Sequence, residues 1–189
     1  MTTTRTLVTI LAISALAIGC SQSEEKPDTT PLPAAAAPPY ICDYIPLGAV
    51  ERMTGLRTPL AKGTFELNFE EDYREGWCGV YQPTGDQWKV LDIELLSNAD
   101  SEKVESEVRD GAKRLPQILP DATGYYSSTR GRNHSGALAV LIRDKFMLVV
   151  DMDRGAEGRD HEADVVALMR LIAPKLIGDP PAPSTEKGS

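Results

Sequence analysis

Short stretches in which hydrophobic and polar residues alternate, or in which apolar residues run together, predict six β-strands. The strands are expected over residues 64–69, 78–82, 89–96, 125–129, 137–142 and 146–152. In the third strand Leu91, Ile93 and Leu95 share one face, which should turn towards the core. The last two strands are apolar on both faces, as covered central strands are, and a tight turn at 143–145 joins them.

Apolar residues at three- and four-residue spacing predict three helices. Pro46 suits the first turn of the first helix, because its missing N–H costs nothing there, and Gly55 supplies the stop. The helices are expected from Pro46 to Gly55, from Asn98 or Asp100 to Pro116, and from Asp160 to Ala173, where Pro174 bends or ends the last. The second helix should lie on the surface of the sheet, because its apolar stripe is only Val104, Val108, Ala112 and Leu115.

This order of elements, α-βββ-α-βββ-α, predicts an α+β fold. We expect a single domain in which helices pack on a mostly antiparallel sheet of about six strands. The chain of 189 residues is long enough for one such domain and not comfortably for two.

The N-terminal segment predicts export. An apolar run from Leu7 falls within the roughly 7–15 residues of a signal-peptide core and short of the ~20 that a spanning helix needs. Arg5 precedes it, and residues 17–20 resemble a bacterial lipobox. The resemblance implies a signal peptide over 1–19 and a lipidated, palmitate-bearing Cys20 as the first mature residue. An ordinary cleaved signal that leaves Cys20 unmodified is the alternative.

Composition sets the remaining boundaries. Residues 20–39 are polar and then rich in proline and alanine, without apolar periodicity, which predicts a disordered tether after the lipidated cysteine. Residues 179–189 are again proline-rich and polar and should form a disordered tail. The globular α+β domain is therefore expected over 40–178.

The net charge of −8 argues against nucleic acid as a partner, because a phosphate-binding surface needs a basic stripe. It also argues against tight electrostatic binding to anionic lipid headgroups. The acidic surface is expected to keep an exported domain soluble.

Three cysteines remain to be placed. With Cys20 in the anchor, Cys42 and Cys78 are the two candidates for a disulfide in an oxidising, exported compartment. Closing that loop would contribute on the order of 3–4 kcal/mol in the chain-entropy model. A structural zinc site is disfavoured, because it needs about four ligands and no histidine lies near either cysteine in the sequence.

Residues for catalysis are sparse. The two histidines, His134 and His161, are expected to be solvated polar residues, and a triad of Ser135, His161 and an aspartate has no motif to support it. The acidic run 151–155 lacks the ligand spacing of a calcium loop. We therefore expect no enzyme, no cofactor and no metal; an enzyme with an unrecognised acidic site at Asp151 and Asp153 is the weakest alternative.

Aromatic residues give one indication of binding. An apolar cleft between the sheet and the helices would suit a lipid or glycan. Aromatic residues at strand positions are also common core residues, which is the alternative. The residues expected to line the cleft are Trp77, Tyr81, Trp88, Tyr125 and Tyr126.

The arrangement of these features resembles a family of actinobacterial cell-envelope lipoproteins, the DUF3558 type. The features shared are the lipobox, the Pro/Ala/Thr-rich spacer, Cys42 ahead of a short helix that ends at Gly55, and Trp77–Tyr81 around the second cysteine. The strand at 146–152 and a last amphipathic helix complete them. The resemblance implies pairing of the two cysteines, a location on the outer face of the cell membrane and no assigned chemistry.

We thus expect a membrane-anchored envelope lipoprotein that binds an apolar envelope ligand or a partner protein without catalysing a reaction. The alternative is a structural or accessory subunit of an envelope complex, which docks through its acidic face to a basic loop of a membrane protein.

Overall fold

A computed structural model describes residues 28–97, 99–130 and 135–180, which form an α+β domain with a seven-stranded antiparallel sheet and a separate two-stranded sheet. The predicted fold class is confirmed. The elements are β1 (Tyr40–Ile41), β2 (Ile45–Pro46), α1 (Leu47–Thr54), β3 (Leu60–Asn68), β4 (Tyr73–Tyr81), β5 (Lys89–Ser97), α2 (Glu102–Arg109), β6 (Lys113–Arg114), β7 (Ala122–Arg130), β8 (Ser135–Arg143), β9 (Phe146–Met152) and α3 (His161–Leu176).

The large sheet has the strand order β3-β4-β5-β9-β8-β7-β6. Two meanders, β3-β4-β5 and β7-β8-β9, join where β5 pairs with β9, so that Ile93 lies opposite Val150. The tight turn predicted at 143–145 connects β8 to β9, and Asp144 adopts a left-handed conformation in it. The nine-residue β3 forms one edge of the sheet, and the two-residue β6 forms the other.

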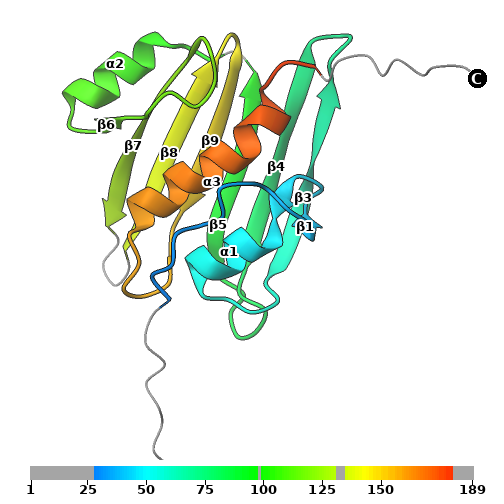
Figure 1. The fold of residues 1–189 in the computed structure, drawn as a ribbon, viewed down its shortest axis with the longest axis vertical. Coiled ribbons are helices and arrows are strands. Elements are labelled where there is room, and N and C mark those ends of the chain that lie inside the picture. The colour runs from blue at the N-terminus through cyan, green and yellow to red at the C-terminus, as the bar shows by residue number, and fades with distance from the viewer. Residues whose placement is uncertain (1–27, 98, 131–134, 181–189) are drawn as a thin grey trace, which may run out of the picture.

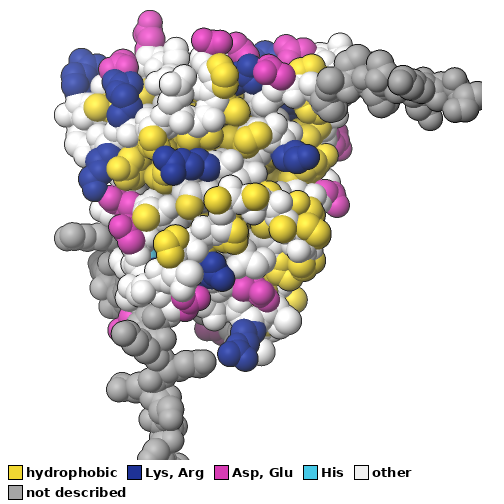
Figure 2. Space-filling model, in the orientation of Figure 1, with side chains coloured by type: hydrophobic (Ala, Val, Ile, Leu, Met, Phe, Trp, Pro, Cys, Tyr) yellow, Lys and Arg dark blue, Asp and Glu magenta, His cyan; other side chains and the backbone are white. Residues whose placement is uncertain are grey.

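The main core lies between one face of the sheet and the helices α1 and α3, which cross that face side by side (Figure 1). Leu91, Ile93 and Leu95 are fully buried there, as the alternation predicted. Met53 of α1 and Leu168 of α3 belong to the same cluster. On this helix-covered side, acidic and basic side chains are interspersed at the surface (Figure 2).

Helix α2 lies on the opposite face of the sheet. Its Val104 packs with Tyr125, Val140 and Ile142, which alternate along their strands with residues of the main core. This second cluster is small and draws on β7, β8 and β9. Beyond it, side chains of the same face become exposed on β4 and β5, where Trp77 is 45% exposed.

Two helix boundaries differ from the prediction. Helix α2 ends at Arg109, not at Pro116, because Gly111 takes a left-handed conformation and the chain turns back to pair β6 with β7. The helix α3 continues through Pro174 to Leu176, so of the two predicted effects of this proline, a bend or an end of the helix, the second was wrong. Full burial of Leu176 offsets the backbone hydrogen bond that the proline cannot donate.

The charged segment 70–76, which lies between the first two predicted strands, is mostly strand. β4 begins at Tyr73 and pairs with β3 as far as Asn68. Arg74 points to the helix-covered face, where its guanidinium lies 4.4 Å from the centre of the Phe69 ring and 4.7 Å from that of Phe146. It donates a hydrogen bond of 2.9 Å to the carbonyl oxygen of Gly178. Burial against two rings therefore explains a charged residue at an inward strand position.

The described part of the predicted tether is packed against the domain. Leu32 is 8% exposed and belongs to the main core cluster. Arg159 donates hydrogen bonds to the carbonyl oxygens of Asp28 and Thr30, and Arg52 forms an ion pair of 3.5 Å with Asp28. We call residues 28–32 the docked segment. The packed region thus includes residues up to twelve positions before the boundary at 40 that composition predicted.

Several predicted features lie outside the described residues: the signal peptide over 1–19, Cys20, the tether up to residue 27, His134 and most of the tail. Within the described residues, no helix is both long and apolar enough to cross a membrane. Asp179, the first residue of the predicted tail, forms an ion pair of 2.6 Å with Arg143.

Candidate functional site

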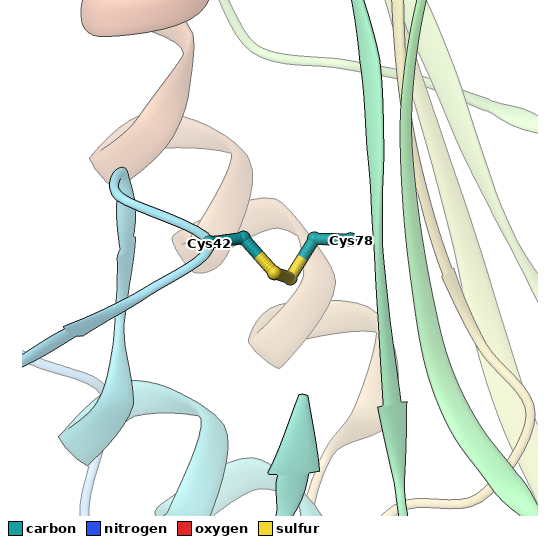
Figure 3. Close-up of a disulfide and its surroundings, with 2 residues drawn as sticks. All are labelled: Cys42 and Cys78. Atoms are coloured by element: carbon teal, nitrogen blue, oxygen red, sulfur yellow. A yellow bond between two sulfur atoms is a disulfide. The ribbon is translucent and has the colours of Figure 1, made fainter. Parts of the chain in front are cut away.

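The predicted disulfide between Cys42 and Cys78 is confirmed, with a Cα–Cα distance of 5.9 Å. Figure 3 shows the bridge running from the loop after β1 to the middle of β4. Cys78 faces the helix-covered side and is fully buried. Because neighbouring strand residues point to opposite faces, Trp77 and Gly79 project to the other side of the sheet. The disulfide therefore ties down the strand that carries Trp77.

The five aromatic residues expected to line a cleft do not come together. Tyr125 lies beneath α2 at 6% exposure, whereas Tyr126 packs against the core on the other side of the sheet. Trp88 is 50% exposed before β5, where it donates a hydrogen bond to Asp86 and stacks with Arg154. The remaining two, Trp77 and Tyr81, share one surface. The structure thus reduces the predicted aromatic set to a pair.

Trp77 and Tyr81 close over Gly79 from both sides. A Cβ atom at Gly79 would lie 2.9 Å from Cζ3 of Trp77 and 2.9 Å from Oη of Tyr81, closer than such contacts normally are. Only a glycine leaves room for the two rings in these positions. On the neighbouring β3, the Lys62 ammonium lies 5.2 Å from the centre of the Tyr81 ring, within cation–π range.

Carboxylates surround this pair on the face of the sheet opposite α1 and α3, in the part of that face that α2 leaves uncovered. We call this uncovered part the outer face. Across β5, Glu94 lies opposite Trp77 and Asp92 lies opposite Gly79. Asp151 of β9 in turn lies opposite Asp92. We call Trp77, Tyr81, Asp92, Glu94 and Asp151 together the outer patch.

Ionisation on the outer face reflects this crowding of negative charge. The Asp151 carboxylate is exposed, but partial desolvation on the sheet and then the charges of Asp153 and Asp92 raise its pKa. A hydrogen bond between Lys89 and Asp92 raises the pKa of the lysine. At the start of β4, a hydrogen bond from the Tyr73 hydroxyl to Glu75 raises the pKa of Tyr73 to about 12. The outer face therefore favours cations.

Two surface hollows, of about 390 and 400 Å³, lie elsewhere in the described part of the chain. The first is lined by residues such as Glu107, Asp110, Ser127, Ser128 and Glu162. The second is lined by Ser135, Arg154, Glu157, Arg159 and His161 together with Gly155 and Gly158. Among the described residues, neither lining contains a Phe, Tyr, Trp or large aliphatic side chain, so neither hollow is the apolar cleft that the aromatic residues predicted.

In the second hollow Ser135 and His161 lie close together, although no sequence motif links them. Nδ1 of His161 lies 3.4 Å from Oγ of Ser135, and Nε2 lies 3.0 Å from the carbonyl oxygen of Ala156. Because a carbonyl can only accept, Nε2 carries the proton and Nδ1 faces the hydroxyl. Within the described residues, no carboxylate completes a triad: Asp160 caps α3, and Asp164 pairs with Arg159 at 2.6 Å.

No group of three or more His, Cys, Asp or Glu side chains in residues 28–97, 99–130 and 135–180 is arranged to hold a metal ion. Asp151, one of the two residues considered for an acidic active site, belongs to the outer patch. What the structure offers there is therefore a charged aromatic surface.

Comparison with known proteins identifies no relative: no family model, no curated protein and no solved structure matches this chain. The resemblance to DUF3558-type lipoproteins thus stays a prediction. The α+β fold, the disulfide and the outer patch come from this structure itself.

Proposed function

We propose that this protein is a lipid-anchored binding module on the outer face of the cell membrane, and that it binds a partner protein through the outer face of its sheet without catalysing a reaction. The observation that carries the proposal is Trp77, a tryptophan 45% exposed in the middle of a sheet face that α2 leaves uncovered.

A partner that covers the exposed part of the Trp77 side chain would gain hydrophobic free energy of binding. A tryptophan buries roughly 150–250 Å² when fully covered. Covering the exposed 45% would remove on the order of 100 Å² from water and contribute about 2.5 kcal/mol at ~25 cal/mol per Å². Leu96, on the same face, is 39% exposed and enlarges the apolar area. Tryptophans in such positions dominate the energy of many protein interfaces.

A protein partner agrees with the described surface better than an apolar small ligand. Small-molecule sites are concave and mostly apolar. The outer patch lies on a sheet face, and neither described hollow is lined by Phe, Tyr, Trp or large aliphatic side chains. The alternative function, a structural subunit of an envelope membrane-protein complex, would use this same surface, because its carboxylates suit a basic loop.

Anchoring at Cys20 would keep the domain close to the membrane. In the sequence, seven residues, 21–27, separate Cys20 from the docked segment that starts at Asp28. A chain of that length spans at most about 28 Å, even fully extended. A partner would therefore be within reach if it lies in the membrane or close to it.

The test compares two substitutions of exposed tryptophans in the full chain. Trp77→Ala removes the centre of the outer patch, and Trp88→Ala is the matched control because Trp88 lies in the loop before β5. On native gels of membranes solubilised in mild detergent, we expect the wild type and Trp88→Ala in a complex and Trp77→Ala as a monomer. Identical migration of all three would contradict binding through Trp77. In the same cells Cys20→Ser should release the protein from membranes.

A further inference from the structure

Charge on the outer face is unbalanced. Alternation along the strands places five carboxylates on it, those of Glu66, Glu75, Asp92, Glu94 and Asp151, and one lysine, Lys62. A second lysine, Lys89, lies beyond a β-bulge between β4 and β5 and reaches this face through its ion pair with Asp92. Like charges also lie directly opposite one another: Glu66 faces Glu75 across β3 and β4, and Asp92 faces Asp151 across β5 and β9. Such cross-strand pairs destabilise a sheet. A cationic occupant would relieve both repulsions.

The aromatic pair already holds one cation. Lys62 lies over Tyr81, which shows that an ammonium group fits on this surface. Trp77 is the better cation acceptor of the two, because indole has the strongest attraction for cations among aromatic side chains. None of the cation–ring contacts in the described residues involves Trp77. Glu75 precedes it by two residues on the same face, and Glu94 lies opposite it.

We propose that the occupant of the outer patch is an extended, Lys- or Arg-rich segment of the partner protein. One cationic side chain lies on the Trp77 indole between Glu75 and Glu94, and others lie near Asp92 and Asp151. This inference rests on the proposed function, since it names the chemistry of the partner that binds there. A neutral glycan would leave the charges of the opposed carboxylates uncompensated.

The test uses the full chain in detergent with Trp88→Phe, which leaves Trp77 as the single tryptophan. The probe is a decapeptide of alternating Lys and Ser, and its control is the Glu/Ser peptide of the same length. We expect saturable change of Trp77 fluorescence with the Lys peptide and none with the Glu peptide. Binding should weaken several-fold between 50 and 300 mM salt, because exposed charges are screened. By calorimetry, Trp77→Ala should weaken binding on the order of 10-fold.

Two double variants with the same change in net charge separate local from general attraction. Glu94→Gln with Asp151→Asn alters the outer patch, and Glu102→Gln with Glu107→Gln alters α2. We expect about 10-fold weaker binding of the Lys peptide in the first and less than twofold in the second. Equal weakening in both would show unspecific attraction and overturn the inference.

Failure of this inference can be told apart from failure of the proposed function. If Trp77→Ala loses its complex on native gels but the Lys peptide does not bind the wild type, the outer face is the binding surface and its occupant is not cationic. Saturable binding of a neutral envelope oligosaccharide in place of the Lys peptide would overturn the cationic occupant in the same way.

Discussion

Substitution of Leu32 tests whether the docked segment is part of the folded domain. Composition places this residue in a disordered tether, whereas the structure leaves only 8% of it exposed and packs it in the main core cluster. Leu→Ala in a core costs roughly 2–5 kcal/mol, from lost transfer free energy and from the cavity that remains. The docked segment precedes the first strand of the domain, so it can detach while the rest stays folded. Detachment limits the free energy of unfolding that the substitution can remove. We expect about 2 kcal/mol for Leu32→Ala.

The assay is urea unfolding of the full chain, followed by tryptophan fluorescence and repeated by calorimetry. For a domain of this size, a loss of about 2 kcal/mol lowers Tm by roughly 4–8 °C. Leu60→Ala is the matched control, because Leu60 is 36% exposed on the edge strand β3. It should cost less than about 0.5 kcal/mol. If Leu32→Ala and Leu60→Ala are equal within that margin, residues 28–32 are not docked.

Three further outcomes are expected. Replacing Cys42 and Cys78 by Ala opens a loop of sequence separation 36 and should cost about 4 kcal/mol in urea unfolding; an unchanged midpoint would contradict the stabilising bridge. Asp164→Asn leaves the buried Arg159 guanidinium without its anion and should cost roughly 3–5 kcal/mol by calorimetry, and a loss below about 1 kcal/mol would show that the pair is solvated. Folding raises the pKa of Asp151 above its ordinary 3.8, so its ionisation opposes folding as pH rises through that window. Asp151→Asn should therefore be more stable than the wild type at pH 7, and in a pH series the difference should vanish below pH 3.8, where the carboxyl is protonated in both the folded and the unfolded state.

Local patterns were sufficient to predict most of the fold. The alternation around Ile93 specifies a strand, because a period of two residues fits no helix. The apolar run around Val150 has the length of a buried strand, about 4–8 residues, and is short for a helix. The pairing of Cys42 with Cys78 followed from their number and from the prediction that the domain is exported. The end of α2 could not be predicted in this way. Ala112 and Leu115 keep helical spacing with Val104, yet they reach two different clusters after the chain has turned at Gly111.

The outer patch and the docked segment depend on long-range packing. The sequence of β4 does not tell whether the face that carries Trp77 is covered by a helix. That face stays uncovered at Trp77 because α2 packs over β7, β8 and β9 instead. The partners of Asp28 come from α1 and from the loop before α3, far away in sequence. A proline- and alanine-rich segment carries no periodicity that would indicate such contacts.

The most direct test of the binding surface is photo-crosslinking in intact cells, with a benzophenone amino acid at position 77 and, as the control, at position 102 on α2. Mass spectrometry of the crosslinked peptides identifies both the partner and the segment that touches the probe. We expect one dominant product from position 77, crosslinked to a Lys- or Arg-rich segment of an envelope protein, and none from position 102. Crosslinks of equal yield from both positions, or no product from position 77, would contradict a binding role for the outer face.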